Sequence, residues 1–218
     1  MLHALRQRSG VTRLAGLLLI LGGLIGLGTS IPVGVAVAAP EPEPVPERWE
    51  LDIRPGPLRV LTVDLGDDGP QSFAVFTYEV VNNSGEDLFF APWFELATDE
   101  GALVRAGRGV PLAATEHFLN YLGDEELKSE IGIQGRLLQG EEHGRQGIAT
   151  WPFEDLDVDE VTIFLSGFSG ETRRVLRPDT GEEVTLRKTL MLRHITPGEI
   201  QPQDESALER TVVRWVMR

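Results

Sequence analysis

Apolar and polar side chains alternate through the segment from Ser72 to Leu96. The positions that share one face are Ala74, Phe76, Tyr78 and Val80 in its first half and Leu88, Phe90, Phe94 and Leu96 in its second half, which Pro92 interrupts. A period of two with β-branched and aromatic residues predicts strands that bury one face. Residues 82–87 supply Asn, Ser, Gly and Asp, which favour a turn between the two halves.

Shorter runs of the same kind predict further strands on both sides of this segment. They cover residues 49–53, 58–65, 103–105, 147–151, 161–165 and 184–192. The first run is separated from the second by Pro55, Gly56 and Pro57, which predict a break between two strands. The tail from Glu209 to Arg218 fits either a last strand or a short helix. Short strands with turns between them, and no long helices alternating with them, favour an all-β antiparallel β-sandwich.

Residues 112–131 change the pattern from alternation to helical spacing. Thr115 is placed to cap a helix with Phe118, Leu119 and Leu122 on one face, and Asp124 to cap another with Leu127 and Ile131. The sequence therefore predicts one or two short helices, inserted between strands of the sandwich.

The first 38 residues have the order of a secretory signal. Basic residues 1–13 precede the uncharged apolar run 14–31, and Ala36-Val37-Ala38 matches a cleavage site of small residues. The alternative is an uncleaved anchor, because the run is just long enough to span a membrane. Either reading predicts export to the periplasm or cell envelope, with membrane contact only through this segment. Residues 39–48 then form a Pro/Glu-rich linker, extended or disordered, and 49–218 the folded domain.

Charge and cysteine content exclude several kinds of function. The formal charge is −14, and without the leader 17 basic side chains face 34 acidic ones. Such a surface repels phosphate backbones, so nucleic-acid binding is not expected. The absence of cysteine removes disulfides, thiolate metal sites and a cysteine nucleophile.

Two polar clusters have the composition of metal sites, but neither has the spacing. Residues 154–160 hold acids at alternate positions, as Ca²⁺ sites do, yet they lack the Gly and Glu of an EF-hand loop. A solvated acidic loop or a weak Ca²⁺ site both fit them. Glu141, Glu142 and His143 lack a second nearby histidine for Zn²⁺, because His117 and His194 are distant in the chain. No metal or cofactor is expected.

No catalytic motif stands out either. Gly167-Phe168-Ser169-Gly170 has the wrong spacing for a nucleophile elbow and fits a turn better. Carboxylate pairs for glycoside chemistry cannot be assigned from sequence among so many acids. No catalytic residue is therefore assigned.

Trp93 is the best candidate for contact with a partner. It lies opposite the predicted core face of its strand, unlike its neighbours Phe94 and Leu96. Exposed there, the indole would suit an envelope protein or a glycan. The alternative is that a second sheet or the helical insertion covers it.

Four segments resemble a known group of domains: Tyr78 to Phe90, Gly140 through Gly147 to Trp151, Leu165 to Glu171, and Arg187 to Leu190. They are similar to exported bacterial immunoglobulin-like β-sandwich domains of uncharacterised function, and the resemblance covers residues 72–195. It implies an immunoglobulin-like strand arrangement and a binding or structural role, with no shared catalytic residues. The Cys…Trp…Cys core of true immunoglobulin domains is missing, so only the architecture is implied.

The resulting expectation is a non-enzymatic binding or assembly module of a bacterial cell envelope. A structural envelope spacer is the alternative, followed by a hydrolase or carbohydrate-active enzyme built from scattered carboxylates. An exposed apolar patch near Trp93 favours binding, whereas a buried acid with a raised pKa in a deep cleft favours an enzyme.

Overall fold

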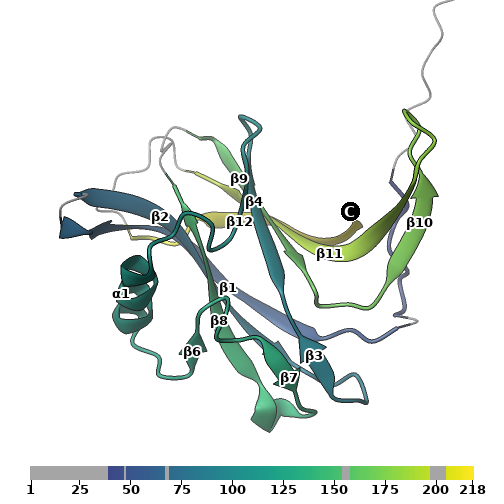
Figure 1. The fold of residues 1–218 in the computed structure, drawn as a ribbon, viewed down its shortest axis with the longest axis horizontal. Helices are drawn as coiled ribbons and strands as arrows, with labels where there is room; N and C mark the ends of the chain where they lie inside the picture. Colours follow the sequence, from purple (N-terminus) through teal and green to yellow (C-terminus); the bar gives the residue numbers. More distant parts are fainter. Residues whose placement is uncertain (1–38, 47, 67–68, 154–157, 197–204) are drawn as a thin grey trace, which may run out of the picture. The chain divides into compact units, whose positions relative to one another are not determined.

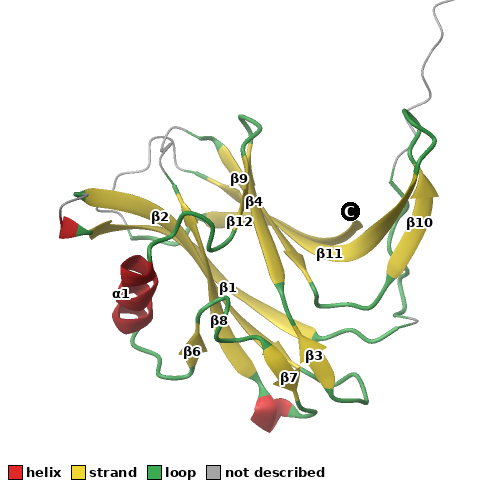
Figure 2. Ribbon diagram, in the orientation of Figure 1, coloured by secondary structure: helices red, strands yellow, loops and turns green. Residues whose placement is uncertain are grey.

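Antiparallel β-sheets dominate the computed structural model, which describes residues 39–46, 48–66, 69–153, 158–196 and 205–218. Of the described residues, 53% are in strands and 9% are helical. Figures 1 and 2 show the sheets and the α-helix labelled α1. The predicted leader lies outside the described residues. Among those that are described, no helix has the length and apolar character to cross a membrane.

The first sheet has four strands in the order β1-β2-β8-β6. These are β1 (Asp52–Asp64), β2 (Pro70–Val81), β8 (Arg145–Pro152) and β6 (Leu127–Lys128). All pairs are antiparallel except β6 with β8. The break predicted at Pro55-Gly56-Pro57 is wrong: β1 runs through it and shifts register against β2 between Pro55 and Leu58. A bulge accommodates prolines without ending a strand, because it leaves residues outside the ladder.

The second sheet has six strands in the order β10-β11-β9-β4-β5, with β12 paired to β11. They are β10 (Thr172–Leu176), β11 (Glu183–Ile195), β9 (Glu160–Ser166), β4 (Trp93–Thr98), β5 (Leu103–Arg105) and β12 (Glu209–Met217). The tail is thus a strand rather than a helix. A third, two-stranded sheet joins β3 (Leu88–Phe90) to β7 (Gly135–Leu137).

The segment from Ser72 to Leu96 contributes to all three sheets. Its first half is β2, while its second half divides at Ala91-Pro92 into β3 and β4, which belong to different sheets. Proline has no N–H for a strand ladder, so the chain leaves one sheet there before it enters the next. The alternation predicted the strands correctly, and they pair both with neighbours in the chain, β1 and β5, and with the distant strands β7, β8 and β9.

Of the one or two short helices predicted in residues 112–131, one forms. Helix α1 spans Leu112–Leu122 and ends at Gly123, which has a positive φ of 66°. The second is wrong, because the Asp124 carbonyl accepts the Leu127 N–H in a turn that leads into β6. A short 3₁₀ turn, η2 (Glu141–His143), precedes β8. Ala114 and Phe118 of α1 pack on the first sheet in a cluster with Leu61, Val63, Phe73, Val75 and Ile148.

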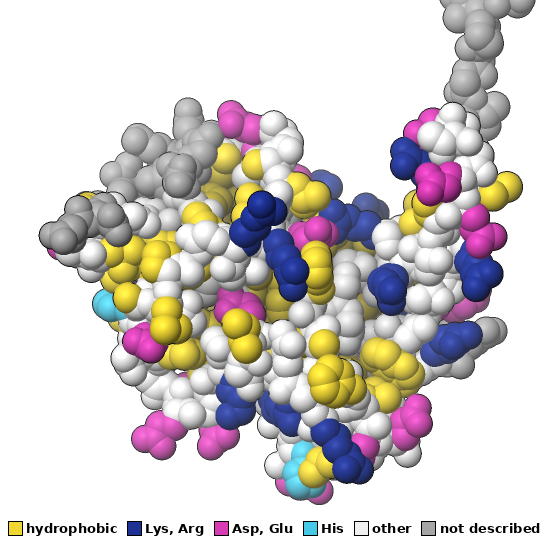
Figure 3. Space-filling model, in the orientation of Figure 1, with side chains coloured by type: hydrophobic (Ala, Val, Ile, Leu, Met, Phe, Trp, Pro, Cys, Tyr) yellow, Lys and Arg dark blue, Asp and Glu magenta, His cyan; other side chains and the backbone are white. Residues whose placement is uncertain are grey.

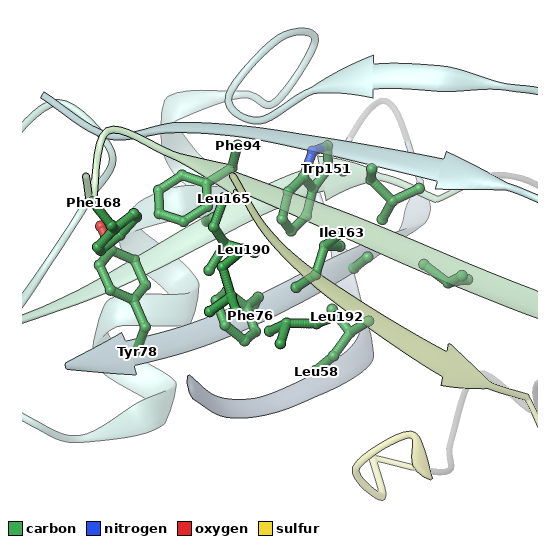
Figure 4. Packing of buried hydrophobic residues seen from close by; sticks show 14 of the residues in the cluster. Leu58, Phe76, Tyr78, Phe94, Trp151, Ile163, Leu165, Phe168, Leu190 and Leu192 are labelled. Atoms are coloured by element: carbon green, nitrogen blue, oxygen red, sulfur yellow. The ribbon is translucent and has the colours of Figure 1, made fainter. Parts of the chain in front are cut away.

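The main core lies between the first and second sheets. Figure 4 shows side chains of both sheets in this cluster, including Phe76, Tyr78 and Trp151 from the first and Phe94, Ile163, Leu165, Leu190 and Leu192 from the second. The indole of Trp151 is completely buried. Burial of large apolar side chains on facing surfaces is the main stabilisation of such a layered domain.

Phe168 is completely buried although it lies in the connection between β9 and β10. Its ring centroid is 5.9 Å from Tyr78, 5.2 Å from Phe90 and 6.0 Å from Phe94. These three rings belong to β2, β3 and β4, so one loop residue joins all three sheets (Figure 4).

Gly147 gives a test of this packing. An added Cβ would lie 2.6 Å from Ile133 Cδ1 and 2.7 Å from the Tyr78 hydroxyl, closer than carbon and oxygen atoms approach. Gly147→Ala should therefore lower the free energy of unfolding by about 1–3 kcal/mol, since Tyr78 is fixed in the core. Urea unfolding measures this change, and a variant as stable as the wild type would show that the core yields there.

Candidate functional site

A cleft of about 850 Å³ opens at one end of β4. Side chains from β4, β5, the start of α1 and the loop 129–134 line it, and we call it the Trp93 cleft. Its members used below are Trp93, Arg105, Arg108, Leu112, Glu130 and Ile131. Figure 3 shows Lys or Arg side chains directly beside hydrophobic ones over the region of β4.

Trp93 begins β4 and points away from the core. The alternation of β4 buries Phe94 and Leu96, whereas the Trp93 side chain is 43% exposed. The Arg105 guanidinium lies 3.5 Å from the centroid of the Trp93 ring, which is cation–π geometry. Neither the second sheet nor the helical insertion buries Trp93. Its exposure is established, and its role in binding stays a prediction.

Aliphatic side chains surround the indole. Leu112 is 73% exposed and Ile131 is 83% exposed. The loop that carries Ile131 is held by its own hydrogen bonds, in which Ile133 donates its N–H to the Ser129 carbonyl and Gln134 Nε2 donates to the Glu130 carbonyl. Single exposed aliphatic residues are ordinary, but several beside a tryptophan at one cleft mark an interaction surface.

Glu130 supplies a half-buried carboxylate to the cleft. Its Oε1 accepts the Thr150 N–H at 2.6 Å. Strand β6 ends at Lys128 and pairs with β8 only at Gln146 and Gly147. The Glu130 carboxylate therefore accepts an N–H of β8 that β6 is too short to reach. Burial raises the pKa of Glu130. Burial also raises the pKa of Tyr78, and the negative charge of Glu130 adds to that effect.

The other carboxylate at the cleft is Glu95, which forms an ion pair with Arg218. Acid–base hydrolysis of glycosides uses two carboxylates, one of them free to act on water or the sugar. Here one carboxylate is bound to a cation and the other to a backbone N–H. Both carboxylates therefore already have a partner within the protein.

A second cavity, of about 740 Å³, lies between residues 39–46 and the strands β11 and β12. The Glu43 N–H donates to Glu171 at 2.9 Å, and the Glu43 carboxylate pairs with Arg173. Buried Lys188 in turn pairs with Glu50 at 2.7 Å and with Glu171 at 3.4 Å. Part of the predicted linker therefore contacts the domain through charged groups.

The residues considered for zinc lie on separate elements. Glu141, Glu142 and His143 form η2, and Glu141 pairs with Arg54 at 3.2 Å. His117 lies on α1, and His194 is buried in β11. Within the described ranges, no three His, Cys, Asp or Glu side chains come together as metal ligands.

Two other sequence candidates belong to loops. Residues 154–157 of the acidic cluster lie outside the described residues, and Glu160 pairs with Arg193 at 3.1 Å. Gly167-Phe168-Ser169-Gly170 connects β9 to β10, as the turn interpretation expects. Ser169 Oγ accepts the Glu171 N–H at 3.1 Å.

The sequence interpretation did not select Arg105, Arg108 or Glu130, and it placed Ile131 on the buried face of a helix, which is wrong. The sequence holds a signal for Arg105, because Thr98-Asp99-Glu100-Gly101 has the composition of a turn between two strands. Alternation on both sides of such a turn puts Trp93 and Arg105 on the same face.

Comparison with protein-family models, curated proteins and solved structures finds no match to this chain. Its function is therefore argued from the cleft itself.

Proposed function

We propose that this protein is an exported, non-enzymatic binding module of a bacterial cell envelope and that it binds its partner at the Trp93 cleft. The main support for this proposal is the composition of the cleft. One aromatic side chain, Trp93, and several aliphatic side chains line it and are exposed to solvent. Aromatic residues in pockets with an apolar surround are the usual anchors of protein interfaces. The leader pattern supports export, with anchoring by residues 14–31 where the leader is retained.

The rim of the cleft favours a protein segment over a glycan. Leu103, Leu112 and Ile131 are exposed there and offer no hydrogen-bonding groups in their side chains. Apolar side chains of a partner protein gain from contact with these aliphatic groups, whereas the polar side chains of the cleft, such as Arg105 and Arg108, would serve a sugar and a protein segment alike.

The arrangement of the two main sheets also supports an immunoglobulin-like architecture. Their shared core and largely antiparallel pairing agree with a sandwich. Many cell-surface domains use this scaffold for binding and carry their contacts at strand ends and loops. The Trp93 cleft lies at such a place, where β4 begins and the loop 129–134 passes.

Glu130 is the one observation that favours a second candidate, a carboxylate-based hydrolase. A half-buried acid with a raised pKa in a cleft is a recognised sign of catalysis. The hydrogen bond from the Thr150 N–H gives Glu130 a structural role, and this role is compatible with a binding module as well as with an enzyme. A hydrolase would lose its activity in Glu130→Gln, whereas the binding module would keep its partner.

The test is co-purification of crosslinked partners from native envelopes. Trp93→Ala should remove the main partner, because it deletes the aromatic anchor; such anchors contribute about 2 kcal/mol or more to binding. Phe89→Ala is the matched control, since Phe89 is also an exposed aromatic residue, 76% exposed, but lies on β3 outside the cleft.

We expect the Phe89→Ala variant to retain the partner and the Trp93→Ala variant to lose it. Equal recovery from both variants would place binding elsewhere. A wild-type protein that recovers no partner would favour the structural spacer.

A further inference from the structure

Two cations of the Trp93 cleft form no ion pair with another described residue. Arg105 and Arg108 are both exposed, and their side chains form no ion pair or hydrogen bond with any other residue that the structure describes. Other cations of the second sheet, including Arg173, Lys188 and Arg193, have carboxylate partners.

Arg105 is held in place without using its hydrogen-bonding edge. Its guanidinium lies over the face of Trp93, at 3.5 Å from the ring centroid. A stacked guanidinium keeps its N–H groups in the plane at its edge, where they match the two oxygens of a carboxylate. Stacking also restricts the side chain before binding, which reduces the entropy lost on contact.

Arg108 lies close in the chain, in the turn that follows β5. The Arg108 N–H donates to the Arg105 carbonyl at 3.3 Å, so the backbone fixes the spacing of the two residues. Both side chains line the same cleft as Leu112 and Ile131. Positive charge and exposed apolar surface are therefore presented together.

The two carboxylates at the cleft do not cancel this pattern. Glu95 is already paired with Arg218, and Glu130 is bound to the Thr150 N–H. Burial raises the pKa of Glu130, which weakens its tendency to carry a charge. An anionic group next to Trp93 therefore meets two arginines that pair with no carboxylate in the described part of the chain.

We infer that the occupant of the Trp93 cleft is an extended segment of a partner protein in which an Asp or Glu side chain stands beside a large apolar side chain. Arg105 and Arg108 hold the carboxylate, and Trp93, Leu112 and Ile131 receive the apolar group. This inference rests on the proposed function, because it names the partner chemistry of the same cleft. Charge complementarity at an interface gives specificity and faster association.

The probe is a random-peptide phage library selected on the full mature domain. The expected result is enrichment of peptides with Asp or Glu near Leu, Ile, Phe or Trp. A synthetic peptide from the enriched set should bind about tenfold more weakly to Arg105→Gln/Arg108→Gln. Arg187→Gln is the control, since Arg187 is exposed and lies outside the cleft. Added salt should weaken binding of the wild type more than that of the double variant.

The outcomes separate the two claims. Peptides that need Trp93 but lack acidic residues, or that bind the double variant as well as the wild type, overturn this inference and leave the proposed function standing. A library that yields no peptide, or only peptides that bind Trp93→Ala unchanged, overturns both. All substituted side chains are exposed, and urea unfolding of each variant should match the wild type.

Discussion

Phe168→Ala should lower the free energy of unfolding by about 3–5 kcal/mol, the cost of removing a fully buried aromatic ring from a packed core. The residue lies in a loop, but it is completely buried and its ring contacts Tyr78, Phe90 and Phe94. Because these rings belong to three different sheets, the cavity would loosen the contacts among all of them. Urea unfolding at neutral pH measures the effect.

Phe89→Ala is again the matched control. Phe89 is adjacent to Phe90 on β3 but exposed, so its loss should change the free energy of unfolding by no more than about 0.5 kcal/mol. A Phe168→Ala protein as stable as Phe89→Ala would contradict the assignment of Phe168 as the residue that joins the sheets.

Acidification should destabilise the protein through His194. Burial, together with the positive charge of Arg210, lowers the pKa of His194 from 6.5 to about 4. Arg210 Nε donates to His194 Nε2 at 3.2 Å, which requires the neutral imidazole. Between these two pKa values the unfolded chain binds the proton and the folded chain does not. The contribution of neutral His194 to the free energy of unfolding is therefore complete above about pH 6.5. The free energy of unfolding falls by roughly 3 kcal/mol as the pH drops toward 4.

The measurement compares wild type with His194→Gln. Glutamine keeps an acceptor for Arg210 but does not titrate, while the neighbouring pair Glu160–Arg193 is common to both proteins. The stability difference between them should change by roughly 3 kcal/mol between about pH 7 and about pH 4, in the direction that penalises the wild type. A difference independent of pH would mean that His194 is protonated as easily in the folded state as in the unfolded one.

The sequence predicted the strands whose side chains alternate strongly. Strands β2, β8, β9 and β11 lie where apolar alternation placed them, because each turns one face to the main core. The prediction of a single buried face is wrong for β2 and β8, whose other face packs with α1. The short strands β6, β7 and β10 gave no such signal. Lys128, Arg136 and Arg173 interrupt them, and it is pairing to distant segments that makes them strands.

The candidate site was only partly predictable. Alternation placed Trp93 opposite the core face of its strand, but it left open whether a second sheet or the helical insertion covers the indole, because that depends on other elements. The positions of Glu130 and Ile131 depend on how the chain turns after Asp124, where helical spacing gave the wrong element. The contacts of Glu43 were equally hidden, because Pro-rich composition shows nothing about a charged partner such as Arg173, which follows it by more than a hundred residues.

Site-specific photo-crosslinking in native envelopes tests the central claim most directly. A photoreactive amino acid replaces Leu112, which lines the Trp93 cleft and is 73% exposed. The control carries the same amino acid in place of Leu176, which is 68% exposed but does not line the cleft. The predicted result is one crosslinked protein from position 112 that is absent from position 176 and is lost when Trp93→Ala is added. The same products from both positions, or products from 112 that survive Trp93→Ala, would contradict binding at this cleft.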